Sequence, residues 1–334
     1  MTRIYYFDVL RSLAILSVIL MHSVSPYIRN IDHQFWNIIN LIDSMVRYSV
    51  PLFVMLSGAL LLSKKDLVIK IFIKKRFSRI LLPTFLWSLI YLYLYKDIAL
   101  DFSTLKTILN APVYYHMWFM YMLISIYIAY PLLWAYIQKA TKSNLQYIIL
   151  VWFLIISIEP ALQKFLGINI GIRSEVITYY MGYFILGYFL HTYNFTFKYS
   201  KIFYALTTLL LICLTAFGTE FLSQTKLNLY FYGNVSPNVI LMSITVFLFF
   251  KELNYEKLYS HYPSINNMII KLSNASLGIY LLHPIILNTI KNNSYFISYC
   301  NALFLQIFIP FIGGAIVSFY LIYLLQKTPL RGIV

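Results

Sequence analysis

Charged side chains are scarce in this sequence of 334 residues. Only 11% of its residues are Asp, Glu, Lys or Arg, whereas soluble domains carry about 25%. Hydrophobic residues make up 60% of the chain, and the mean hydropathy is +0.74. This balance excludes an ordinary soluble domain and favours a protein built mainly of membrane-spanning segments.

Cysteine is nearly absent too, since the chain holds only Cys213 and Cys300. Their positions give neither a metal-ligand spacing nor a disulfide framework, so no metal site is expected. We expect no cleavable secretory signal, because the first apolar run is as long as a full span and no small-residue cleavage site follows it. No internal repeat or low-complexity linker is visible. We expect one transmembrane domain over 1–334, with no appended soluble domain.

Long apolar runs are what the sequence does contain. Runs of about 17–25 residues between polar clusters predict membrane helices. The predicted fold class is an all-α polytopic membrane bundle of about ten transmembrane helices. Their approximate limits are 9–28, 46–63, 79–96, 115–137, 145–162, 177–193, 201–219, 235–251, 268–290 and 303–325. The sixth run is the most amphiphilic.

The basic residues lie in short segments between these runs. A net charge of +15 could suggest nucleic acid as a partner, but topology explains the positions of the charges better, so no nucleic-acid binding is expected. With the N-terminus inside, 18 of the 26 Lys and Arg residues fall on the cytoplasmic side, and seven of these lie in the loop 64–79. Cytoplasmic loops are rich in Lys and Arg. An even number of spans then predicts that both termini are cytoplasmic.

The first apolar run contains three ionisable residues, Asp8, Arg11 and His22. Such residues are costly inside a membrane and commonly mark a functional path. Eleven residues separate Arg11 from His22, which is about three helical turns, so both lie on nearly the same face. Asp8 lies one turn before Arg11. The spacing predicts a polar stripe from one interface to the membrane centre, about 16 Å deep.

Several motifs along the chain resemble the acyltransferase family 3 of bacterial membrane proteins. The first-helix segment 7–22 is similar to the family's opening signature, and four further motifs follow in the family's order. They lie at 50–58, at 116–119 with Tyr127 and Pro131 after it, at 182–188 and at 276–284. The resemblance covers essentially the whole chain.

This resemblance implies an integral membrane O-acyltransferase of the bacterial cytoplasmic membrane. The family is thought to take an acyl group from cytosolic acyl-coenzyme A and to deliver it across the membrane to a glycan. For this chain we expect acetyl-CoA as co-substrate, no bound cofactor, and a hydroxyl of an extracytoplasmic or lipid-linked saccharide as acceptor. His22 is the candidate general base, because a neutral imidazole can take the hydroxyl proton. Packing between helices is the alternative for His22.

Donor binding is expected at the inner face. Arg11, Arg76 and Arg79 could bind phosphate groups through paired hydrogen bonds, and Lys75 could act as a point charge. The alternatives are that the basic loop only sets topology and that Arg11 forms a structural pair with Asp8. Ser57, before Gly58, fits close helix packing or cavity lining, and an acyl-serine nucleophile is the alternative.

Acceptor binding is expected at the outer face and along the ninth helix. His116 and Trp118 fit either an interfacial aromatic belt or stacking against sugar rings. Tyr280 and His283 share a polar face with Ser276, which predicts that they line a cavity. Glu159 and Arg173 could bind the glycan or be ordinary solvated loop residues.

Two other functions fit the same residues less well. A transporter or polysaccharide export component would also use intramembrane His and Arg, but no repeat relates the two halves of the chain. A non-catalytic sensor or scaffold is the third alternative. The other partners expected are membrane lipids.

Overall fold

The computed structural model describes residues 3–96, 102–168, 170, 179–293 and 302–333, and every regular element in these ranges is helical. The N-terminal half contains α1 (Tyr5–Ile28), α2 (Trp36–Ser44), α3 (Ser49–Leu62), α4 (Ile69–Arg76), η1 (Phe77–Leu81), α5 (Leu82–Lys96), α6 (Phe102–Asn110), α7 (Trp118–Ile137), α8 (Lys142–Phe153), η2 (Leu154–Ile158) and α9 (Glu159–Leu166). The rest contains α10 (Met181–Thr192), α11 (Ser200–Leu222), η4 (Tyr230–Tyr232), α12 (Pro237–Lys251), α13 (Tyr255–His261), α14 (Pro263–Lys291), α16 (Leu303–Leu325) and η5 (Pro329–Ile333).

Local sequence signals explain where several helices begin and end. The Thr141 side chain accepts a hydrogen bond from the backbone N–H of Asn144, which forms a capping box at the start of α8. Pro237 and Pro263 occupy the first turns of α12 and α14, where no intrahelical N–H is needed. α9 ends at Gly167, whose φ of 68° is the left-handed conformation that favours glycine.

Nine helical segments of the described residues are long and apolar enough to cross a membrane. They confirm the all-α polytopic bundle. The difference from the ten predicted spans lies in the sixth, because α10 has only 12 residues. α10 is nevertheless buried along most of its length, so protein rather than lipid surrounds it. The cytoplasmic placement of both termini stays a prediction.

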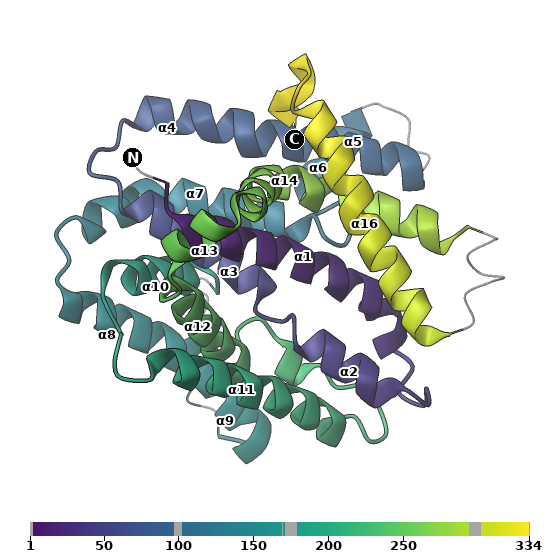
Figure 1. The fold of residues 1–334 in the computed structure, drawn as a ribbon, viewed down its shortest axis with the longest axis horizontal. Coiled ribbons are helices and arrows are strands. Elements are labelled where there is room, and N and C mark those ends of the chain that lie inside the picture. The colour runs from purple at the N-terminus through teal and green to yellow at the C-terminus, as the bar shows by residue number, and fades with distance from the viewer. Residues whose placement is uncertain (1–2, 97–101, 169, 171–178, 294–301, 334) are drawn as a thin grey trace.

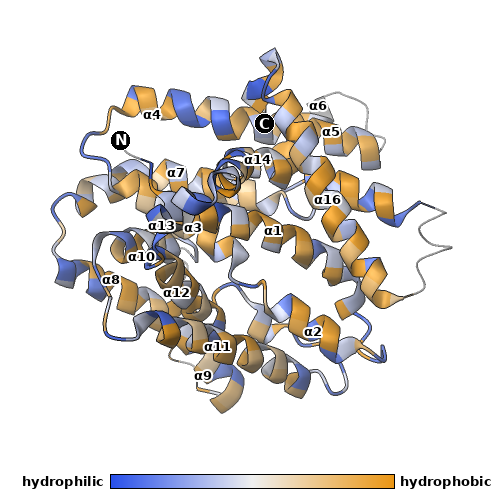
Figure 2. Ribbon diagram, in the orientation of Figure 1, coloured by the Kyte–Doolittle hydropathy of each residue, from blue (hydrophilic) through white to orange (hydrophobic). Residues whose placement is uncertain are grey.

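α1 occupies the centre of the bundle. It contacts α2, α3, α12, α14 and α16, and it crosses the middle of the molecule in Figure 1. The outer helices differ, since α11 exposes Leu210 and Phe217 with 67% and 68% of their surface free. Figure 2 shows apolar residues along nearly every helix, as expected where the outer faces meet lipid. The polar residues of α1 therefore face protein.

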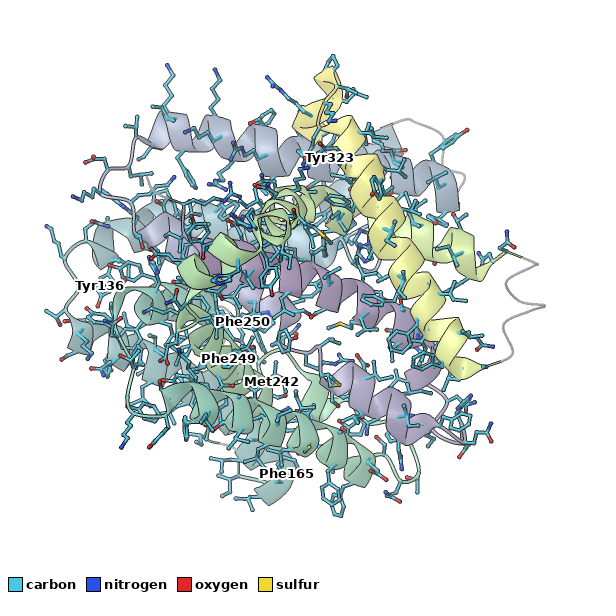
Figure 3. The ribbon with its side chains drawn as sticks, viewed as in Figure 1. Tyr136, Phe165, Met242, Phe249, Phe250 and Tyr323 are labelled. Atoms are coloured by element: carbon cyan, nitrogen blue, oxygen red, sulfur yellow. The ribbon has the colours of Figure 1, made fainter. Side chains whose placement is uncertain are left out.

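Side chains at the periphery of the bundle are exposed, and those in its interior are buried. Phe165 and Tyr136 lie at the periphery in Figure 3 and are about half exposed, whereas Met242 is fully buried. Apolar side chains outside the bundle are consistent with a lipid environment, and those inside fill the contacts between helices.

Glycine allows α3 and α10 to approach closely. A Cβ atom at Gly58 would overlap the backbone carbonyl of Phe184, and one at Gly187 would overlap the backbone of Met55. Small residues permit such contacts in membrane bundles. The predicted close helix packing at Gly58 is confirmed, and it holds the short α10 against the bundle beside the site.

Candidate active site

A cavity of about 780 Å³ lies between α1, α3, α7 and α14, and residues of η1 and η5 also line it. This volume is in the usual range for small-molecule sites. Its walls mix apolar and polar side chains. They are Arg11, Phe53, Ser57, Leu60, Leu61, Arg76, Ser78, Arg79, Ile80, Phe119, Leu123, Tyr127, Ser273, Asn274, Ser276, Leu277, Tyr280, Arg331 and Gly332.

Four arginines, Arg11, Arg76, Arg79 and Arg331, line this cavity, and its described lining contains no carboxylate. The predicted donor residues Arg11, Arg76 and Arg79 are thus brought together. The guanidinium of Arg76 lies 4.7 Å from the ring centre of Tyr127, and its buried Nε has no partner in the described part of the chain. Such a concentration of positive charge fits a ligand with several negative charges.

The positive charges of these arginines also act on Lys64, which lies just after α3. Burial lowers the pKa of Lys64, and the nearby charges of Arg76, Lys75 and Arg79 lower it further. The basic residues of this loop therefore act on one another. Lys75 is exposed and does not line the cavity, so its predicted contact with the donor stays a prediction.

The structural Asp8–Arg11 pair, which is the alternative to a functional Arg11, does not form as a direct contact. Asp8 instead accepts two hydrogen bonds from Arg3, at 2.6 and 3.1 Å, because Arg3 folds back over the first turn of α1. Ser273 of α14 donates to Asp8 at 2.6 Å, and Arg11 donates to the Ser273 hydroxyl at 3.2 Å. Asp8 therefore acts on Arg11 through Ser273. The guanidinium of Arg11 has no carboxylate partner within 4.0 Å among the described residues.

α1 and α14 run side by side in the same direction along the site. Arg11 contacts Ser273 at one level, and the His22 and His283 rings stack at the other, with centroids 5.4 Å apart. The spacings of the two pairs along their helices are eleven and ten residues, which are nearly equal rises. The polar stripe predicted on α1 therefore has a matching stripe on α14.

His22 belongs to a cluster of three histidines. The His116 and His283 ring centres are 5.7 Å apart, and Tyr115 lies 5.0 Å from His22. Ser17, the intrahelical candidate to orient His22, donates instead to Tyr48. Ring contacts from α14 and from the segment before α7 position the His22 imidazole.

Two of these histidines carry ring nitrogens without a hydrogen-bond partner. His283 is fully buried, and its Nδ1 lies 3.1 Å from the carbonyl of Ile279, so Nδ1 carries the proton. Its Nε2 is then an acceptor, and it has no partner among the described residues. Neither ring nitrogen of His116 has a hydrogen-bond partner among the described residues, and one of the two is an N–H donor. Buried polar atoms without partners commonly mark a place where a ligand or water binds.

Tyr280 connects the cavity with the histidines. It lines the cavity, and its hydroxyl donates to the backbone carbonyl of His116. Ser276, one turn earlier, also lines the cavity, so two of the three residues of the predicted polar face do so. His283 does not line the cavity itself but lies directly beyond Tyr280, at a ring distance of 5.9 Å.

A second feature at His22 was missed by the sequence analysis. Pro26 has no N–H, so the carbonyl of His22 lacks its normal intrahelical donor. Lys291, at the end of α14, donates to the carbonyls of His22 and Ser23 at 3.1 and 3.2 Å. A proline four residues after a membrane histidine is the signal that could have indicated a freed carbonyl.

The remaining predicted residues lie elsewhere. Trp118 begins α7 and packs against Tyr180, and Glu159 begins α9. Neither lines the cavity. Arg173 lies outside the described residues. Ser57 does line the cavity, but its hydroxyl donates to the carbonyl of Phe53 in its own helix.

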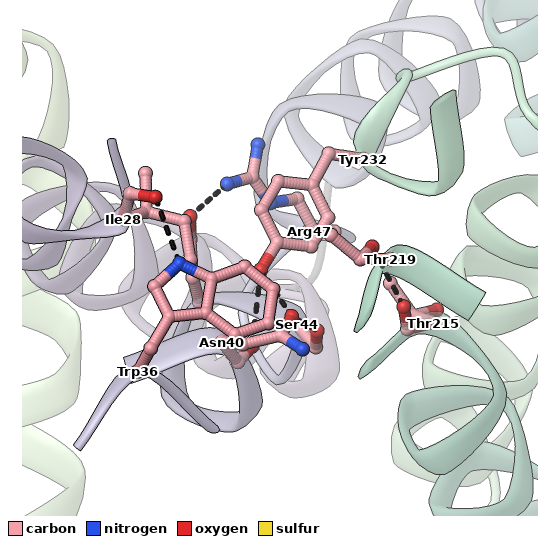
Figure 4. A network of polar contacts seen from close by, with 9 residues as sticks. Ile28, Trp36, Asn40, Ser44, Arg47, Thr215, Thr219 and Tyr232 are labelled. Atoms are coloured by element: carbon pink, nitrogen blue, oxygen red, sulfur yellow. Dashed lines mark hydrogen bonds and ion pairs between the residues drawn. The ribbon is translucent and has the colours of Figure 1, made fainter. Parts of the chain in front are cut away.

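A second polar network lies between α2, α11 and η4, apart from the cavity. Figure 4 shows Arg47, Asn40 and Tyr232 at its centre. Arg47 forms an ion pair with the fully buried Asp43, and its guanidinium lies 3.7 Å from the centre of the Tyr232 ring. Asn40 donates to the carbonyl of Ala216 at 2.7 Å and accepts from Tyr232.

Comparison with known proteins adds one finding. A family model described as an acyltransferase domain matches residues 4–326. No curated protein and no solved structure matches the chain.

Proposed function

Because the chain belongs to the acyltransferase family 3, we propose that it moves an acetyl group from acetyl-CoA to a saccharide hydroxyl in the bacterial cytoplasmic membrane. The acceptor would be an extracytoplasmic or lipid-linked saccharide. The observation that carries this proposal is the continuity from an arginine-lined cavity, through Tyr280, to a cluster of three histidines.

The donor would lie in the cavity with its phosphate groups among the arginines. A coenzyme A thioester carries a diphosphate and a ribose phosphate at one end and the acyl group at the other. Arginine binds phosphate through paired hydrogen bonds, and no carboxylate competes within the described lining. The acyl end would then point toward Tyr280 and His22.

His22 would act as the general base. As the hydroxyl oxygen of the acceptor bonds to the thioester carbonyl carbon, His22 takes the hydroxyl proton. The carbon–sulfur bond then breaks, coenzyme A leaves as a thiolate, and the proton from His22 can return to that sulfur. The unpartnered Nε2 of His283 and the ring of His116 would hold the hydroxyl for this attack.

Transfer without an acyl-enzyme is the simpler route. Ser57 is the candidate nucleophile in the cavity, but its hydroxyl donates to the Phe53 carbonyl, and no base bonds it among the described residues. A serine nucleophile needs a base within hydrogen-bond reach. We therefore infer that the acceptor attacks the thioester directly.

The acceptor would approach over an aromatic surface beyond the histidines. Tyr91, Tyr95 and Tyr114 stack with ring centres between 4.6 and 6.0 Å apart. Asn288 donates to the Tyr114 hydroxyl at 2.6 Å. Tyr115 is half exposed beside His22. Tyr91 is buried beneath this surface and donates to the carbonyl of Leu281. The exposed Tyr95 and Tyr115 are therefore the residues that would offer flat faces to sugar rings and hydroxyls to sugar oxygens.

The decisive experiment is turnover of radiolabelled acetyl-CoA by purified protein in proteoliposomes, with a bacterial glycan or its lipid-linked precursor as acceptor. We expect wild type to consume the thioester, and His22→Ala to lose at least about 100-fold in rate. His33→Ala is the matched control, because His33 lies in the segment between α1 and α2 and bonds only the nearby Phe35 N–H.

Two outcomes would overturn the proposal. If folded wild type consumed neither acetyl-CoA nor another acyl-CoA, the acyl donor would be wrong. If His22→Ala kept the rate of His33→Ala, His22 would be a packing residue rather than the base.

A further inference from the structure

The short helix η5 forms part of the cavity wall. Trp87 of α5 anchors its last residue by donating to the carbonyl of Ile333 at 2.9 Å, and the N–H of Leu330 bonds the neighbouring Thr328 hydroxyl at 3.2 Å. η5 also contacts η1, which carries Arg79. The segment after α16 is thus attached over the cavity instead of projecting away from the bundle.

Arg331 of η5 lines the cavity together with Gly332. Its side chain is exposed, and it has no carboxylate partner within 4.0 Å in the ranges that the structure describes. The other cavity arginines come from α1, α4 and η1, so four separate elements bring like charges to one volume. Like charges repel, and an anion between them removes that cost.

The position of Arg331 in the cavity indicates which part of a ligand it would meet. Tyr280 is 5% exposed and marks the end of the cavity next to the histidines. Arg331 and Arg79 are exposed and mark the open end. A donor whose acyl group reaches Tyr280 therefore has its opposite end, the nucleotide, beside Arg331. Arg331 lies after residue 326, beyond the region that the family model matches.

We propose that Arg331 binds a phosphate group of the nucleotide and makes η5 a specificity element for nucleotide-bearing thioesters. This inference rests on the proposed function. It explains why η5 is attached to Trp87, since the anchor fixes the guanidinium over the open end of the cavity. A thioester without phosphate groups would gain nothing from Arg331.

The test compares two donors, acetyl-CoA and S-acetylpantetheine, which has the same acyl group and thioester but no nucleotide. We expect Arg331→Ala to raise the KM for acetyl-CoA about tenfold, because a charge-assisted contact to phosphate is lost. The kcat should not change. With S-acetylpantetheine, kcat/KM should stay within about twofold of wild type. Arg331→Lys should recover part of the loss.

Lys327→Ala is the matched control. Lys327 belongs to the same segment, but its ammonium lies 4.4 Å from the ring centre of Tyr323, which Figure 3 labels on α16, and it does not line the cavity. Its removal takes away one positive charge at similar exposure. We expect no change in KM for either donor.

Two results would overturn the inference while leaving the proposed function intact. Arg331→Ala could leave the KM for acetyl-CoA unchanged, or it could impair both donors equally, as expected if η5 only shapes the cavity. If wild type consumed neither donor, calorimetry with coenzyme A would decide. Tighter binding by wild type than by Arg331→Ala would retain the inference, and equal or absent binding would reject it.

Discussion

Arginine occurs in two regions of this protein under opposite conditions. Arg47 lies in the network of Figure 4, paired with Asp43 and covered by the Tyr232 ring. Arg11, Arg76 and Arg331 line an open cavity and have no carboxylate partner among the described residues. Arg11 lies within α1, and Arg47 lies between α2 and α3 in the segment Trp36–Leu62. Both segments are apolar and long enough to span a membrane.

The difference teaches how to separate structural from functional charges. The two charges of a buried ion pair neutralise each other, so removal of one partner lowers the stability of the fold. An unpaired cation that lines a cavity can bind an anionic ligand, so its removal weakens ligand binding. The two regions should therefore respond oppositely to mutation.

The largest effect on stability is expected in the paired region. Asp43→Asn leaves the charge of Arg47 without its partner, and breaking a buried pair in this way costs about 3–5 kcal/mol. Thermal unfolding in detergent measures this loss. Asp32→Asn is the control, because Asp32 is exposed in the segment just before α2. A raised donor KM with unchanged stability would show that the network belongs to the binding site.

Arg11→Ala should give the reverse pattern. We expect the KM for acetyl-CoA to rise about 10- to 100-fold, since contacts to a charged group contribute about 1.5–3 kcal/mol. Thermal stability should change little, because Arg11 gives up only the hydrogen bond to Ser273. A large loss of stability with unchanged KM would place Arg11 in the same class as Arg47.

A variant of Arg76 tests whether the unpaired arginines of the cavity bind the donor. Arg76→Ala should raise the donor KM about tenfold, and the effect should shrink at high ionic strength because the site is partly open to salt. Lys74→Ala is the control, since Lys74 is exposed on the same helix and does not line the cavity. Equal effects of the two variants would mean that only the net charge of the loop matters.

The smallest effect is expected at Ser57, a polar residue that lines the cavity but is already satisfied. Ser57→Ala removes a hydroxyl that bonds its own helix, so activity should stay within about twofold of wild type. Steady-state rates with acetyl-CoA measure this. A loss of 100-fold or more would instead support an acyl-serine intermediate.

Much of the site could be predicted from single helices. Helical period alone places Arg11 and His22 on one face of α1, and Ser276 with Tyr280 on one face of α14. Arg11, Ser276 and Tyr280 all line the cavity. The predicted basic residues Arg76 and Arg79 also reach it, because α4 and η1 carry them to the same side.

The helical period cannot predict which residue of another element bonds a given side chain. Asp8 is a near neighbour of Arg11 in sequence, yet Arg3 takes its carboxylate and Ser273 stands between Asp8 and Arg11. Spacing fixes which residues share a face, but it does not fix which of several cations reaches one carboxylate. Rotamers and backbone turns decide that.

The length of α10 shows the same limit for the fold. Composition predicted a span over 177–193, but α10 has only 12 residues and is buried against α3, at the glycine contact of Gly58 with Phe184. Hydrophobic content cannot distinguish a helix that faces lipid from one that protein covers.

The sequence by itself determined the class of this protein, because apolar runs long enough to span a bilayer must form helices there. It also determined the polar stripe of α1, which depends only on the rise and period of one helix. The tertiary structure alone decided that His22 stacks on His283 and that Arg331 joins Arg11 at one cavity. In both cases the residues lie more than 250 positions apart in the sequence, and only the packing of helices brings such residues together.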